Sequence, residues 1–134
     1  MNNTYNYRWT YSGCDEDLGM ESSIVSNSSI NASSHLGEGY EPWNARHNRH
    51  HGKGAWCAGQ KAKDEFIQVQ FTRIHVIARV SLQRKEKTSP GDTVGKAWVT
   101  KFVLAYSDDG VSWSEYSDGN GVTVSIANVD SYKF

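Results

Sequence analysis

The chain has 134 residues, enough for one compact domain, and its 37% hydrophobic and 22% charged residues can bury a modest core. With only 2 prolines and 12 glycines, the chain is neither collagen-like nor proline-rich. No apolar run approaches the roughly 18 residues of a membrane-spanning helix. The net charge of −1 conceals a basic middle, since residues 44–104 carry a net +8 between two acidic ends, which predicts a local anion-facing patch and no general binding of nucleic acid.

The first third of the chain is predicted to be mostly irregular. Residues 1–13 are polar and aromatic without a usable period, which indicates a loose N-terminal arm. No basic-then-apolar secretion signal follows Met1. Residues 14–43 are rich in Ser, Asn and Gly, so loops should dominate, with short extended pieces around Ile24 and Ile30.

Alternating apolar residues predict strands in the second half of the chain. Three stripes with apolar side chains at every second position lie at 67–71, 74–82 and 98–106. The turn Asp108-Asp109-Gly110 makes 98–116 a predicted hairpin, and a further stripe occupies 122–126. Residues 64–126 should therefore be mainly antiparallel strands in an all-β sandwich or barrel, with Trp98 and Trp113 in its core.

Cysteines and glycosylation triplets bear on the compartment. Cys14 and Cys57 can form at most one internal disulfide, and neither has a second cysteine at a zinc-binding spacing. Asn2, Asn27 and Asn31 each begin an Asn-X-Ser/Thr triplet, the acceptor sequence for N-linked glycans. The triplets favour an extracellular location slightly.

Two loops between the predicted strands are candidates for a binding site, because long loops on a rigid β scaffold commonly carry function. Residues 35–43 mix apolar residues with Gly and Pro, and residues 84–95 are basic and contain two glycines. Arginine suits bidentate contact with phosphate, sulfate or carboxylate, and lysine adds a point charge. Leu36 and Tyr40 could enter a lipid interface, or Tyr40 could stack on a sugar ring.

The histidine-rich segment 47–53 has three interpretations. Its histidines could bind a metal ion, but adjacent His50 and His51 point in different directions in most loops, so no metal site is predicted. The loop could be cationic, with Arg49 and Lys53 charged and the histidines joining them in mild acid. It could also be a solvated surface loop. Trp43 is expected to pack under its loop, and Arg46 could be a buried, paired charge.

Several sequence blocks occur in a specific order. They are Cys14, Leu18-Gly19-Met20-Glu21-Ser22, Ile30-Asn31-Ala32-Ser33-Ser34, Ala45-Arg46-His47-Asn48, Gly54-Ala55-Trp56-Cys57, Phe66-Ile67-Gln68-Val69, Leu82-Gln83-Arg84, Trp98-Val99-Thr100-Lys101-Phe102 and the run from Tyr106 to Trp113. Together they resemble the discoidin domain, also called the coagulation factor V/VIII type C domain. His47, Phe66 and Gln70-Phe71 depart from the family, which usually has Leu, Trp and Asp-Leu there.

The resemblance implies a jelly-roll β-sandwich of the galactose-binding-domain-like kind, with ligand-binding loops at one end. Residues 14–134 would form this domain without the family's last strands, which normally follow a position like Phe134. The family partners of Cys14 and Cys57 would lie in that missing part, so no Cys14–Cys57 disulfide is expected. Family members are extracellular modules that bind phospholipid head groups, collagen, heparin-like glycans or galactose-type sugars.

The sequence thus predicts a secreted or cell-surface, non-enzymatic binding module without a cofactor. Its leading partners are anionic phospholipid and sulfated glycan, with peripheral membrane contact. Alternatives are a lectin for galactose-type sugar, a collagen-type matrix-protein binder, and a fragment without its own function. Cys57 lacks the orienting groups of a catalytic nucleophile. The expected ligand-binding residues are His35, Leu36, Glu38, Tyr40, Arg49, His50, His51, Lys53, Arg84, Lys85 and Lys87.

Overall fold

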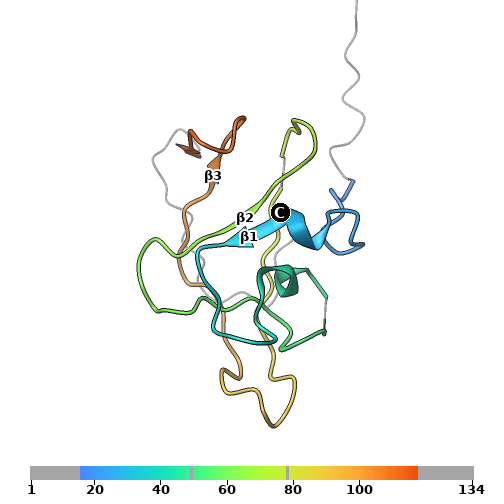
Figure 1. Ribbon diagram of the computed structural model, residues 1–134, viewed down its shortest axis with the longest axis vertical. Helices are drawn as coiled ribbons and strands as arrows, with labels where there is room; N and C mark the ends of the chain where they lie inside the picture. The colour runs from blue at the N-terminus through green and yellow to red at the C-terminus, as the bar shows by residue number, and fades with distance from the viewer. Residues whose placement is uncertain (1–15, 49, 78, 118–134) are drawn as a thin grey trace, which may run out of the picture.

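Short antiparallel strands and single 3-10 turns, joined by long loops, make up the fold (Figure 1). The computed structural model describes residues 16–48, 50–77 and 79–117. Its elements in chain order are η1 (Asn27–Ser29), β1 (Ile30–Ala32), η2 (Pro42–Ala45), β2 (Ile67–Val69), β3 (Ala105–Tyr106) and β4 (Ser114–Glu115). The described residues include no α-helix and no helix long and apolar enough to cross a membrane.

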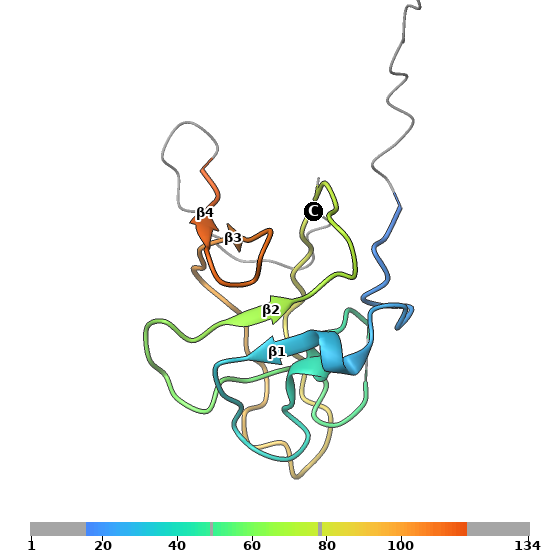
Figure 2. The same cartoon turned by 45° about the horizontal axis from the view of Figure 1, so that its top comes forward.

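The strands β1 and β2 form the centre of the molecule, where they lie side by side in antiparallel register (Figure 2). Ile30 pairs with Val69, and Asn31 pairs with Gln68. Ile30 is buried with 2% of its surface exposed, whereas the next side chain, Asn31, faces solvent. This alternation is what a strand with one covered face requires, and it confirms the extended segment expected around Ile30. Of the predicted stripe at 67–71 only Ile67–Val69 is a strand, and its Ile67 is 37% exposed. The extended piece expected around Ile24 is wrong, since Ile24 belongs to no strand.

A second antiparallel pair, β3 and β4, is the hairpin that the turn at residues 108–110 predicted. Ala105 pairs with Glu115, and Tyr106 pairs with Ser114. One carboxylate oxygen of Asp109 accepts hydrogen bonds from the backbone N–H groups of Val111 and Ser112, at 2.8 and 2.7 Å. The N–H of Ser112, followed by that of Val111, holds the pKa of Asp109 well below its usual range. The hairpin is therefore closed by local side-chain chemistry.

We expect this hairpin to lose stability in acid. The lowered pKa of Asp109 means that its stabilising contribution is complete above the ordinary value of 3.8 and is lost as the pH falls below it toward the folded value. Hydrogen-exchange protection of the Tyr116 N–H, which donates to the Leu104 carbonyl at 2.7 Å, should fall accordingly. Asp109→Asn should remove this acid dependence and Asp108→Asn should retain it; equal behaviour of the two variants would contradict the assignment.

The other predicted strands are largely wrong within the described residues. Ile74 and Val76 are 80% and 78% exposed, and the described parts of 74–82 belong to no strand. In the 98–106 stripe only Ala105–Tyr106 is a strand, and Trp98 and Trp113 are 54% and 48% exposed, so they are not core residues. A strand needs a hydrogen-bonded neighbour as well as an alternating pattern, and the described residues supply none for 74–77. The predicted stripe at 122–126 lies outside the described residues.

The interior contains few apolar side chains and an unusual share of polar ones. Among the residues that the structure describes, the buried apolar ones are Val25, Ile30 and Tyr40. Arg46 is 3% exposed and donates to the backbone carbonyls of Met20 and Val25, at 2.7 and 2.6 Å, and to the amide oxygen of Asn27 at 2.8 Å. Arg46 is thus a buried charge whose two terminal amino groups, Nη1 and Nη2, are held by hydrogen bonds. It joins residues 20–27 to the end of η2.

Candidate functional site

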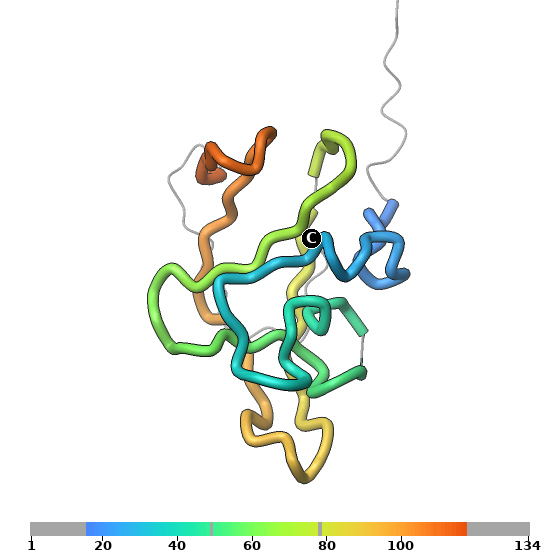
Figure 3. The backbone as a smooth tube through the Cα atoms, viewed as in Figure 1, coloured from blue at the N-terminus to red at the C-terminus, as the bar shows by residue number. Residues whose placement is uncertain are grey.

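Three loops meet at one end of the molecule, and we call the described parts of residues 35–43, 47–53 and 84–95 the rim. Figures 1 and 3 show the first and third loops at the end away from the β3–β4 hairpin. The backbone N–H of Lys53 donates to the Gly39 carbonyl at 2.8 Å. The Tyr40 hydroxyl donates to Asp92 at 2.9 Å, and the Lys53 ammonium donates to the Gly91 carbonyl at 3.4 Å. Each loop is therefore hydrogen-bonded to another.

Close backbone approach between the first two loops explains two of their glycines. Gly39 and Gly52 both have positive φ, 88° and 59°. A Cβ at Gly52 would lie 2.6 Å from the Gly39 carbonyl oxygen, and a Cβ at Gly39 would lie 2.9 Å from the Lys53 side chain. Any larger residue at either position would thus be strained and would also push the loops apart.

The third loop is organised around a buried ion pair between Lys85 and Asp92. The side chains of Lys85 and Asp92 are 2% and 0% exposed. The Lys85 ammonium also donates to the carbonyls of Glu86 and Gly95, at 2.9 and 3.1 Å. Asp92 accepts from the backbone N–H groups of Thr88 and Gly95, at 3.1 and 3.2 Å. Both charges are surrounded by partners, which is the condition for burying an ion pair.

Tyr40 completes this cluster from the first loop. The Tyr40 side chain is only 5% exposed, and its hydroxyl donates to the same carboxylate that Lys85 contacts. The hydrogen bond from Lys85 is the largest cause that holds the pKa of Asp92 well below its usual range. Tyr40 and Lys85, both expected at the ligand surface, are thus inside the rim and occupied with Asp92. Tyr40 and Lys85 are therefore placed to hold the loops together, and a ligand would contact other residues of the rim.

Other expected site residues are exposed on the rim. Leu36 is 47% exposed. Lys87 is exposed, and its ammonium makes no hydrogen bond or ion pair with the described residues. His35, Glu38, His50 and His51 are exposed as well, Lys53 is half-buried, and Arg49 lies outside the described residues. The rim therefore exposes an apolar side chain on its first loop and a cation without a partner among the described residues on its third.

Ion pairs at the base of the third loop reduce its free charge. Arg84 contacts Glu86 at 2.6 Å, and Lys96 lies 3.5 Å from the other oxygen of the same carboxylate. Arg84 and Glu86 are nearly half exposed, so water and salt screen this network. The exposed charged residues of this loop are the cations Arg84 and Lys87 and the acid Glu86. The exposed part of this loop is therefore net positive.

A shallow pocket of about 430 Å³ opens beside the first two loops. It is lined by Asn27, Glu38, Gly39, Glu41, Trp43, Asn44, His51 and Gly52. Trp43 is 40% exposed there, so the expectation that it packs under its loop is wrong. A hydrogen bond from the Gly39 N–H, joined by one from Asn44, lowers the pKa of Glu41. The pocket offers an aromatic ring and acidic acceptors.

Cys57 lies near the buried ion pair and has none of the features of a reactive thiol. It is a free cysteine and is partly buried, and this burial raises its pKa. Cys14 lies outside the described residues, so the expected absence of a Cys14–Cys57 disulfide stays a prediction. Among the residues that the structure describes, no group of three or more His, Cys, Asp or Glu is placed to hold a metal ion.

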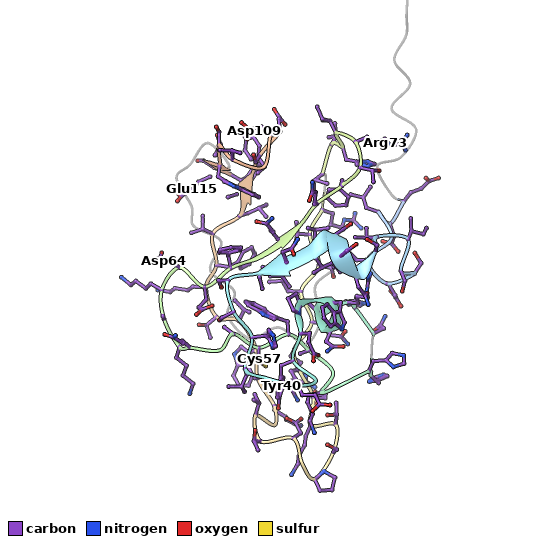
Figure 4. All side chains as sticks on the ribbon, viewed as in Figure 1. Tyr40, Cys57, Asp64, Arg73, Asp109 and Glu115 are labelled. Carbon is purple, nitrogen blue, oxygen red and sulfur yellow. The ribbon has the colours of Figure 1, made fainter. Side chains whose placement is uncertain are left out.

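Sequence reasoning missed two residues that shape this end of the molecule. In the sequence, Asp92 is an acidic residue in a basic loop. Only its position between Gly91 and a turn that ends at Gly95 could have suggested that it organises the loop. Trp43 follows Pro42 in a segment that becomes η2, where a single 3-10 turn leaves its ring partly open. Figure 4 shows Tyr40 and Cys57 together at the rim end, away from Asp109 and Arg73.

Comparison with known proteins gives a consistent result. The sequence profile described as the F5/8 type C domain matches residues 29–133. Coagulation factor V of Sus scrofa is 30% identical over 118 residues, which cover 85% of this chain and 5% of that protein. Epithelial discoidin domain-containing receptor 1 of Homo sapiens is 30% identical over 120 residues, 87% of this chain and 13% of the receptor.

A third relative is the non-catalytic subunit of the venom prothrombin activator omicarin-C from Oxyuranus microlepidotus. It is 31% identical over 109 residues, which cover 79% of this chain and 7% of that subunit. The chain therefore spans a small part of each of these relatives.

Proposed function

Because the chain belongs to the F5/8 type C domain family, a family of β-sandwich binding modules, we propose that it is a non-enzymatic extracellular module that attaches to an anionic surface. The proposed ligand is an anionic phospholipid head group or a sulfated glycan, held by the rim. The proposal includes a jelly-roll order of strands and peripheral contact with a membrane. The relatives include a receptor and a non-catalytic venom subunit, which supports a binding role outside the cell.

The observation that carries the proposal is that the rim exposes both an apolar side chain, Leu36, and a cation without a partner, Lys87, on loops that are held together from within. Leu36 is 47% exposed and Lys87 has no partner among the described residues. Positive charge attracts an anionic surface over about a Debye length, and an apolar side chain adds burial at short range. Tyr40, Lys85 and Asp92 would preset the loop spacing, which lowers the entropy lost on binding.

Reversing one rim charge should weaken binding strongly. A lysine near an anionic membrane contributes about 1 kcal/mol, so Lys87→Glu, which also adds repulsion, should lose roughly 30-fold in affinity. The measurement is sedimentation with vesicles of phosphatidylserine and phosphatidylcholine, or retention on heparin, at several salt concentrations. Lys63→Glu is the matched control, because Lys63 is exposed beside Asp64, which Figure 4 shows on a different loop from the rim.

Equal binding by the parent protein and Lys87→Glu, with no effect of salt, would contradict the anionic rim. Lys85 is unsuitable for this experiment although it belongs to the same loop. Its buried ammonium contacts Asp92, so Lys85→Glu would bury two carboxylates against each other and disturb the fold.

A second candidate ligand is a neutral galactose-type sugar, favoured by the pocket that contains Trp43. The 40% exposed ring could stack on a sugar face, and Glu38 and His51 could hydrogen-bond to its hydroxyls. Trp43 takes the stacking role that the sequence suggested for Tyr40, since Tyr40 is buried. Binding to a galactose matrix that is insensitive to salt and lost in Trp43→Ala would favour this candidate over the anionic one. Binding to collagen alone would favour a matrix-protein module.

A further inference from the structure

We infer that Asn31 is a site of N-linked glycosylation, an inference that rests on the extracellular location in the proposed function. Asn31 begins the triplet Asn31-Ala32-Ser33, which has the required hydroxyl residue at its third position and no proline at its second. Of the three such triplets, the one at Asn2 lies outside the described residues. Asn27 and Asn31 can be compared directly.

The side chain of Asn31 is placed to carry a large polar group. Asn31 is the central residue of β1 and faces solvent, between the buried Ile30 and the half-buried Ala32. Its side-chain amide makes no hydrogen bond within the described part of the chain. Its backbone register opposite Gln68 keeps the strand in place independently of the side chain. A glycan on this nitrogen would therefore extend into solvent without displacing a packed group.

Asn27 has a structural task by contrast. Its amide oxygen accepts a hydrogen bond from the buried Arg46 at 2.8 Å, and its side chain lines the pocket with Glu38 and Trp43. A sugar on Asn27 would stand in the mouth of that pocket. The folded structure thus accommodates a glycan on Asn31 more readily than one on Asn27.

Ser33 indicates when the modification must occur. Its hydroxyl contacts the Glu65 carboxylate and accepts from the Phe66 N–H at 2.9 Å once β1 has paired with β2. The glycan transferase needs that hydroxyl and an extended acceptor, so transfer precedes strand pairing. In the transfer the Asn31 amide nitrogen forms a bond to the anomeric carbon of the first sugar. The bond from that carbon to the pyrophosphate of a lipid-linked oligosaccharide donor breaks, the lipid pyrophosphate leaves, and the nitrogen loses one proton.

The test is expression of the full 134-residue chain behind a secretion leader in animal cells. Secreted protein is treated with peptide N-glycosidase in heavy-oxygen water, which marks each formerly glycosylated Asn as labelled Asp in peptide mass spectra. We expect label at Asn31 in most molecules, its loss in Asn31→Gln, and its retention in Asn27→Gln and Ser33→Thr.

Secreted protein without label at Asn31 would overturn the inference, and so would label that fragment spectra place on Asn27 alone. The proposed function fails independently of these results. Vesicle and heparin binding of the enzymatically deglycosylated protein tests the rim whether or not Asn31 was modified.

Discussion

Replacing Lys85 by Met is expected to lower the free energy of unfolding by about 3 kcal/mol or more. Methionine has nearly the length and volume of the lysine stem, so the substitution removes the charge and leaves the packing almost unchanged. The ammonium of Lys85 contacts Asp92 and donates to two backbone carbonyls while its side chain is 2% exposed. Its removal would leave the buried carboxylate without its counter-ion, which is the costly way to break a buried ion pair.

The control for Lys85→Met is Lys87→Met, the same substitution two positions further along the same loop. Lys87 is exposed and has no partner among the described residues, so Lys87→Met should change stability by less than about 0.5 kcal/mol. Urea unfolding followed by tryptophan fluorescence measures both. The double variant Lys85→Met/Asp92→Asn should recover part of the loss, because no unpaired charge then remains. Equal stability of the two single variants would contradict the buried pair.

The second large effect is expected at Arg46, whose replacement by Met should cost about 3 kcal/mol. The guanidinium is 3% exposed and donates to the carbonyls of Met20 and Val25 and to the amide of Asn27. Buried acceptors that lose their donor cost roughly 1–3 kcal/mol each. Residues 20–27 would also lose their main polar attachment to the end of η2.

Arg73→Met is the matched control for Arg46→Met. Arg73 is exposed, and Figure 4 shows it at the end of the molecule away from Tyr40, so its loss should leave the unfolding midpoint nearly unchanged. Arg46→Lys tests geometry, because one ammonium cannot reproduce the planar fork that reaches three acceptors. We expect it to restore less than half of the lost stability. Full restoration would show that charge alone matters at this position.

Local chemistry in the sequence determined the β3–β4 hairpin. Asp109 captures backbone N–H groups two and three residues away, so the turn requires little from the rest of the chain. The family resemblance correctly indicated the F5/8 type C domain. The turn depends on the spacing of a few neighbouring residues, and the family assignment depends on the order of sequence blocks. Both can be read from the sequence without coordinates.

Packing between distant segments decided the extent of the strands and the roles of the lysines. Residues 74–82 alternate like a strand, but alternation cannot show whether a neighbour is present to pair with it. Lys85 and Lys87 are chemically identical and stand in the same basic loop. Only the tertiary structure shows that Asp92 and Tyr40, which are 52 residues apart, enclose the first and leave the second in solvent. Burial depends on what the rest of the chain brings to a side chain, and the residues beside it in the sequence do not contain that information.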